Sequence, residues 1–169
     1  MIDTQTLIAA INNIANAISG LMNKNKESVI NTIPYENSWT IAQVADHITR
    51  STNSINHALQ MEAPMALRDP AERNEELMGT FLNRNVKFKS PEFILPTQQL
   101  YDKNVLIHHF NQAFNQLNET AKSTDLSGMI KHPAFGDITK LELLYFVLYH
   151  TMRHHQQMLD FIEILHGEK

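Results

Sequence analysis

His150 and His154 are the two side chains whose spacing most directly suggests metal chemistry. On a helix, residues four positions apart lie about 40° apart around the axis and about 6 Å apart along it. Both imidazoles can therefore reach one ion. The spacing alone is a weak signal, because a buried histidine pair can also be satisfied by side chains, carbonyl groups or water. The zinc-protease motif H-E-x-x-H is absent, because Thr151 follows the first histidine where that motif carries its glutamate base.

The segment that carries this pair has the features of a long buried helix over residues 139–165. Thr139 and Glu142 have the spacing of a capping box, which predicts where the helix begins. Its apolar residues then form two nearly opposite stripes, which is typical of a helix buried on two sides. The histidine pair falls with one of these stripes. We therefore expect both rings to face protein, where each ring nitrogen needs a partner.

His47 lies on a second predicted helix. Thr40 and Gln43 form another capping box, which predicts a helix over about residues 41–61. His47 lies near the edge of the core stripe of this helix, about 100° from its centre. From this position alone we expect a boundary or exposed histidine, hydrogen-bonded to Asp46 or to water, although it could also face a groove between helices. Three other histidines are expected to be solvated: His57, His108 and His109.

Two more long helices are predicted from their caps and apolar periodicity. Asp3 or Thr4 can begin a helix whose apolar residues recur at helical spacing as far as Met22. Asp102 can begin another, in which apolar residues as far as Ala121 follow the alternating spacing of bundle packing. Residues 123–137 then connect it to the last helix.

The stretch between the second and third long helices, residues 62–100, holds four of the six prolines. It contains only one short helix by pattern, with Asp69 as its cap, Pro70 and Glu72 in its first turn, and an end near Arg84. We expect a long crossover of the kind that joins parallel helices in a bundle. The predicted fold class is all-α: one domain over residues 1–169, built as a four-helix bundle with this crossover between helices two and three.

Composition narrows the function classes. The 169 residues include no cysteine, which excludes disulfides, thiolate ligands and cysteine nucleophiles, so any metal here has nitrogen or oxygen ligands. The net charge of −4 argues against nucleic-acid binding, with only a small basic group at Arg84, Lys87 and Lys89. No signal peptide and no membrane span are predicted. We expect a cytoplasmic protein.

Two segments resemble the DinB-like superfamily of bacterial four-helix proteins, also called the YfiT-like metal-dependent hydrolases. SWTIAQVADHI, residues 38–48, is similar to the family's tryptophan-containing start of helix two with its histidine. HPAFGDITKLELLYFVLYHTMRHHQQM, residues 132–158, is similar to its loop and last long helix. The helix lengths and the crossover agree as well, so the resemblance spans essentially the whole chain.

The resemblance implies a metal site. In the family three histidines bind one divalent ion, reported as nickel, zinc or iron, and the matching residues are His47, His150 and His154. Three nitrogen ligands leave coordination positions open, as in catalytic sites. Candidates to orient the imidazoles, by their nearness in sequence, are His155, Asp46, Tyr149 and Gln43.

The resemblance also implies an activity. Some family members are transferases that join low-molecular-weight thiols such as bacillithiol or mycothiol to electrophiles, one is a thiol-dependent isomerase, and others are regarded as hydrolases. We therefore expect a metal-dependent enzyme that activates a bound water or thiol, with a small-molecule substrate and no identified catalytic residue. The alternative is a non-enzymatic bundle with a structural or sensing metal site. A homodimer is a further expectation from the resemblance.

Overall fold

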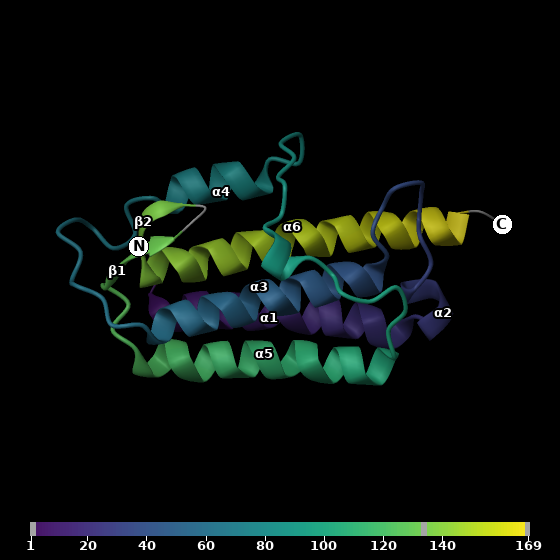
Figure 1. The fold of residues 1–169 in the computed structure, drawn as a ribbon, viewed down its shortest axis with the longest axis horizontal. Coiled ribbons are helices and arrows are strands. Elements are labelled where there is room, and N and C mark those ends of the chain that lie inside the picture. The colour runs from purple at the N-terminus through teal and green to yellow at the C-terminus, as the bar shows by residue number, and fades with distance from the viewer. Residues whose placement is uncertain (1–2, 133–134, 168–169) are drawn as a thin grey trace.

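Four long helices lie side by side in the computed structural model, which describes residues 3–132 and 135–167 (Figure 1). Helices α1 and α3 each pack against α5 and α6, so the core lies between these four elements. The four-helix bundle predicted from the sequence is confirmed. The long helices are α1 (Thr4–Lys24), α3 (Ile41–Gln60), α5 (Lys103–Ser123) and α6 (Lys140–Gly167).

The predicted caps fix where these helices begin. The side chain of Asp3 accepts a hydrogen bond from the backbone of Thr6, and Asp102 caps α5 in the same way. Thr40 forms the expected capping box with Gln43 at the start of α3. At the start of α6, Thr139 and Glu142 exchange backbone-to-side-chain bonds of 2.9 and 3.0 Å. Each cap satisfies backbone N–H groups that a helix leaves without an internal partner.

The crossover returns the chain along the length of the bundle, so that α3 and α5 run parallel (Figure 1). It carries helix α4 (Asn74–Leu82), which packs along α6, and the short 3-10 helix η1 (Glu92–Ile94), which packs on α3. A single turn of helix, α2 (Glu27–Ile30), precedes α3. The crossover therefore covers the two helices on which the three candidate histidines lie.

Helix α4 begins later than predicted. Asp69 does not cap it: its carboxylate accepts a bond from Ala71 N within a turn. The helix starts at Asn74, after Arg73, whose backbone N–H donates to the Glu142 carboxylate of α6 at 2.9 Å. A contact with a distant helix thus decides this boundary.

A two-stranded antiparallel hairpin occupies the connection predicted for residues 123–137. Strand β1 (Met129–His132) pairs with β2 (Gly136–Thr139), and Gly136, the first residue of β2, adopts a φ of 65°. Ile130 and Ile138 are cross-strand partners and both are buried. Strands of four residues are too short to show an alternating pattern in the sequence.

Helix α6 is buried on both predicted faces only in its first half. All residues from Lys140 to Thr151 are buried, whereas Met152 and Leu159, expected in a core stripe, are 38% and 40% exposed. The reason is that α4 covers only the first part of α6, and the end of α6 extends past α3 and α5 (Figure 1). Among the described residues, no helix has the length and apolarity needed to cross a bilayer.

Candidate metal centre

The structure brings together the three histidines identified from the sequence. His150 and His154 lie one turn apart on α6, and His47 faces them from α3. The Nε2 atom of His150 lies 3.1 Å from Nε2 of His47 and 3.1 Å from Nε2 of His154. Ring nitrogens from two helices that are distant in sequence therefore converge on one point.

Hydrogen bonds on the outer side of the rings determine how two of these nitrogens point. His47 Nδ1 lies 2.9 Å from the carbonyl oxygen of Ile94, and His154 Nδ1 lies 2.7 Å from the side-chain oxygen of Gln157. Because an oxygen acceptor brings no hydrogen, each Nδ1 must carry the proton. The Nε2 atoms of His47 and His154 consequently present lone pairs towards His150.

The cluster cannot satisfy its own nitrogens. A neutral His150 ring has at most one Nε2 hydrogen, and it can donate that hydrogen to His47 or to His154 but not to both. At least one inward lone pair therefore has no hydrogen-bond donor within the cluster. A cation placed between the rings would accept all three lone pairs at once.

The spacing suits a metal ion. Two nitrogens that each lie about 2.1 Å from one metal are about 3.0 to 3.4 Å apart, for bond angles from about 90° to about 110°. The two 3.1 Å separations fall within this range. No carboxylate joins the cluster among residues 3–132 and 135–167, so the donor set is three imidazoles, which suits zinc, nickel and iron.

Burial keeps the rings in the form that binds metals. It lowers the pKa of His154 from 6.5 to about 3, with the nearby His47 as the next cause. Burial, followed by His154 and His47, holds the pKa of His150 well below 6.5. For His47, burial lowers the pKa although the Ile94 carbonyl and Asp46 act in the opposite direction. All three imidazoles are therefore neutral near pH 7.

Aromatic side chains form the walls of the cluster. Phe146 stacks on His150 with ring centroids 5.0 Å apart, and the ring of Trp39 lies 5.2 Å from that of His47. Phe81, from the crossover helix α4, turns its edge to His150 at 6.2 Å. His47 is 2% exposed and His150 is 7% exposed, while His154 is only partly buried. His154 is therefore the most accessible of the three rings.

His47 is not the boundary or exposed histidine expected from its helical position. The crossover covers it, and its hydrogen bond goes to Ile94 of η1 and not to Asp46. Asp46 instead accepts bonds from Arg50, Tyr101 and Thr97.

The other residues expected to orient the imidazoles bond elsewhere. Gln43 caps α3 and donates to Gln98 O, and Tyr149 donates to Asn74. His155 lies outside the cluster. Gln157 and the Ile94 carbonyl fill this role instead. His57, His108 and His109 are exposed, as predicted.

A groove on the surface of the bundle lies away from the three histidines. It has a volume of about 560 Å³ and runs between α3 and α5. None of the three histidines lines it. Asp46, Arg50 and Tyr101 are among its lining residues, so the side of α3 that faces this groove differs from the side that carries His47.

The fold and the cluster together define a four-helix bundle protein with three convergent histidines between two of its helices. Comparison with known sequences identifies the family: a sequence model of the DinB superfamily matches residues 9–158, and the chain belongs to this superfamily. The uncharacterized protein YuaE of Bacillus subtilis (strain 168) is 23% identical over 154 residues, which cover 88% of this chain and 90% of that protein.

Solved structures support the fold. TT2238, described as a four-helix bundle protein, matches with a TM-score of 0.62 and 16% identity, over 94% of this chain and 99% of its own. A conserved protein from Enterococcus faecalis matches with a TM-score of 0.70 and 13% identity, over 99% of each chain. At these identities the likeness concerns the fold alone.

Proposed function

We propose that His47, His150 and His154 bind one divalent metal ion, which is nickel, zinc or iron, and that the protein is a metal-dependent enzyme. The observation that carries this proposal is the convergence of three Nε2 atoms, at least one of which has no hydrogen-bond donor within the cluster. Membership of the DinB superfamily agrees with it, since the resemblance in sequence implies the same three ligands.

The bound ion supplies a Lewis acid with open coordination positions, at which the pKa of a water or thiol falls. The chain itself contributes orientation. Ile94 and Gln157 hold two imidazoles with their Nε2 atoms inward, and second partners of this kind commonly raise metal affinity. The aromatic walls exclude bulk water from His47 and His150, so a substrate approaches past His154.

The reaction we favour is transfer or hydrolysis with a low-molecular-weight thiol or water as the nucleophile. The sequence has no cysteine, so any thiol chemistry must use sulfur from the substrate. The thiolate, and not the thiol, is the reactive form, and a metal-bound thiol loses its proton. No residue of the cluster other than the three histidines is assigned to the chemical step.

The test begins with the metal content of protein purified without chelators. We expect a divalent ion bound at this site, and loss of that ion in the His150→Ala variant. Assays for thiol transfer with several low-molecular-weight thiols, and for hydrolysis, then follow on the loaded protein. Turnover that requires the ion supports an enzyme. Stabilisation by the ion without any turnover would instead favour a structural site, and the absence of binding would contradict both.

A further inference from the structure

Arg153 lies on α6 between the two histidines of the pair, and it reaches away from them to the crossover. Its Nη1 donates to the carbonyl oxygens of Phe81 at 3.1 Å and Asn83 at 2.8 Å. Its Nη2 donates to the carbonyl oxygen of Val86. In the described part of the chain no carboxylate forms an ion pair with this guanidinium. Arg153 is thus a partly buried cation held by main-chain oxygens.

The carbonyls that it binds belong to the end of α4 and the segment after it. The last carbonyls of a helix have no partner within the helix and carry partial negative charge, so a cation there satisfies them. Arg153 therefore caps the C-terminal end of α4 and holds the turn that follows it. Because its three observed bonds all go to this segment, it is committed to the crossover and not to an anionic ligand of the cluster.

Ring contacts continue from Arg153 to the histidine cluster. The guanidinium lies over the ring of Phe88, 5.4 Å from its centroid. Phe88 stacks on Phe81 at 5.2 Å, and Phe81 turns its edge to both Phe146 at 5.0 Å and His150 at 6.2 Å. The segment of residues 81–88, which we call the crossover wall, thus joins Arg153 to the buried ring of His150.

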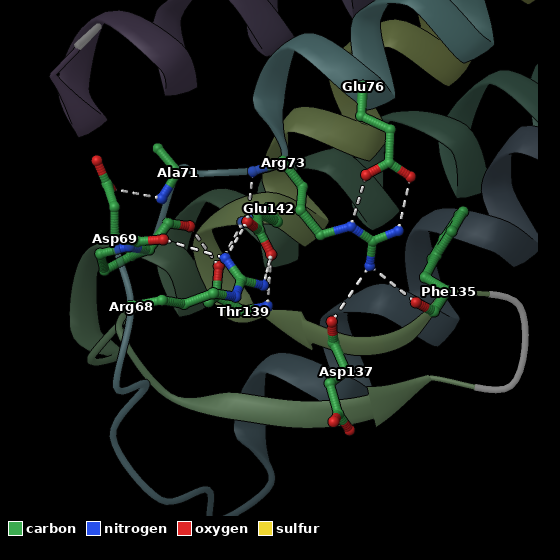
Figure 2. A network of polar contacts seen from close by, with 10 residues as sticks. Arg68, Asp69, Ala71, Arg73, Glu76, Phe135, Asp137, Thr139 and Glu142 are labelled. Atoms are coloured by element: carbon green, nitrogen blue, oxygen red, sulfur yellow. Dashed lines mark hydrogen bonds and ion pairs between the residues drawn. The ribbon is translucent and has the colours of Figure 1, made fainter.

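Helix α4 is held to α6 at both ends. At its start, the Glu142 carboxylate binds Arg68 and the backbone of Arg73 (Figure 2). At its end, Arg153 binds the crossover wall. The first attachment, at Glu142, lies slightly more than two turns before His150 along α6, and the second is on the next turn after it. Only the second attachment is adjacent to the cluster.

We propose that Arg153 is a positioning residue that holds the crossover wall against α6 and, through Phe81, fixes the ring of His150. That Arg153 holds the crossover wall against α6 is argued from its contacts alone. The effect on metal retention rests on the proposed function. Loss of Arg153 should free the wall and loosen His150, and a bound ion should then leave more easily.

The first test uses metal-free protein, so its outcome does not depend on the proposed function. The crossover wall and the residues after it contain Arg84, Lys87 and Lys89, which are cleavage sites for trypsin. We expect cleavage there to be about tenfold faster in Arg153→Met than in the wild type, because local opening controls access for the protease. Arg153→Lys should give an intermediate rate, since an ammonium cannot span three carbonyls in the same way.

A matched control is Arg50→Met. Arg50 also reaches the crossover, at Thr97, but on the other side of α3 from the cluster. It should leave cleavage at the wall unchanged. Equal cleavage rates in wild type, Arg153→Met and Arg50→Met would overturn the proposal. Should Arg153→Met fail to fold by circular dichroism, Arg153→Lys provides the same comparison.

Two further readouts separate positioning from a purely structural role. In metal-free protein, the imidazole NMR signals of His150 should shift in Arg153→Met, because the Phe81 ring moves, and those of the exposed His57 should not. In loaded protein, release of nickel into excess chelator should be about tenfold faster. If Arg153→Met speeds cleavage of the crossover wall but leaves the His150 signals unchanged, Arg153 does not position His150. If the wild type binds no metal, the proposed function fails. The role of Arg153 is then still tested by two measurements on metal-free protein, the rate of trypsin cleavage and the NMR signals of His150.

Discussion

Two buried polar clusters lie on the same helix, α6, and they are balanced in different ways. At its start, the Glu142 carboxylate is fully buried and accepts four hydrogen bonds, two from Arg68 at 2.5 and 2.7 Å and one each from the backbones of Arg73 and Thr139. Further along, three neutral imidazoles point their nitrogens at one another. The first cluster contains the donors that its carboxylate needs, whereas the second has no donor for at least one of its inward lone pairs.

The pKa shifts express the same difference. Burial alone would raise the pKa of Glu142, but the bonds from Arg68, Thr139 and Arg73 outweigh it and lower that pKa. At the histidines nothing outweighs burial, which lowers each pKa. A buried group that the fold has fully paired indicates a structural role, whereas a group left without its partner indicates a ligand that is still to bind.

The largest expected effect is on the paired cluster. Glu142→Gln removes the charge that balances Arg68 and places amide hydrogens among donors, so we expect the free energy of unfolding to fall by about 3 kcal/mol. This is the low end for a buried pair, because Arg68 is 22% exposed. Urea unfolding of the metal-free protein measures it. Glu76→Gln is the control, since Glu76 binds Arg73 but is 58% exposed, and it should cost below about 0.5 kcal/mol. Similar costs for both variants would contradict a structural role for Glu142.

A divalent metal should raise the free energy of unfolding by binding to the histidine cluster, and the Glu142 cluster should have no part in this gain. Nickel or zinc at a concentration of 100 times its dissociation constant should add about 2.7 kcal/mol to the free energy of unfolding. Glu142→Gln should retain this gain, since it leaves the ligands in place. His150→Gln should lose it, while the metal-free form of that variant should unfold at the same urea concentration as the wild type or higher, because one of the facing nitrogens is gone. Equal metal stabilisation in His150→Gln would exclude His150 as a ligand.

A smaller effect is expected from the side chain that orients His154. Gln157→Leu removes the oxygen that accepts from His154 Nδ1, and metal affinity should fall by about tenfold. Competition with a chelator of known affinity measures the change. Gln156→Leu is the matched control, because the neighbouring Gln156 bonds to Asp160 on the exposed side of α6. A loss of affinity in both variants alike would mean that the effect comes from the helix and not from the ring.

The sequence predicts the long helices well because their start signals are local. Asp3, Thr40, Asp102 and Thr139 each bond to a residue three positions later, and such spacing is readable without knowing the fold. The start of α4 was not predictable in this way. It depends on a bond between Arg73 and Glu142, which lie 69 residues apart.

The same distinction applies to the site. The spacing of His150 and His154 on one helix singles them out as candidates, although that spacing is by itself a weak signal for a metal. Gln157 could have been found by the same reasoning, since it lies one turn after His154. His47 entered the set only through the family resemblance, because its helical position suggested a boundary residue. Its partner is the carbonyl of Ile94, 47 residues away. A main-chain oxygen has no sequence signature, so only the folded crossover reveals this contact.

The two clusters should reduce the stability of the fold in different pH ranges, because folded and unfolded states differ in proton uptake by His154 at a higher pH than by Glu142. In the unfolded chain a histidine takes up its proton near pH 6.5, but folded His154 stays neutral until about pH 3. The unfolded state therefore binds more protons below pH 6.5, and metal-free protein should lose about 1.4 kcal/mol of stability per pH unit for His154 alone. The pKa of Glu142 is lowered from 4.5, so its contribution is lost only at more acidic pH.

Urea unfolding of metal-free protein between pH 7.5 and pH 5 measures this slope. His154→Gln should make the slope shallower, because one group that protonates only on unfolding has been removed. Glu142→Gln should lower stability at every pH in this range without altering the slope. If stability stays constant down to pH 5.5, the imidazoles are not held neutral by burial. The contrast between a paired carboxylate and an unpaired histidine cluster would then have to be given up.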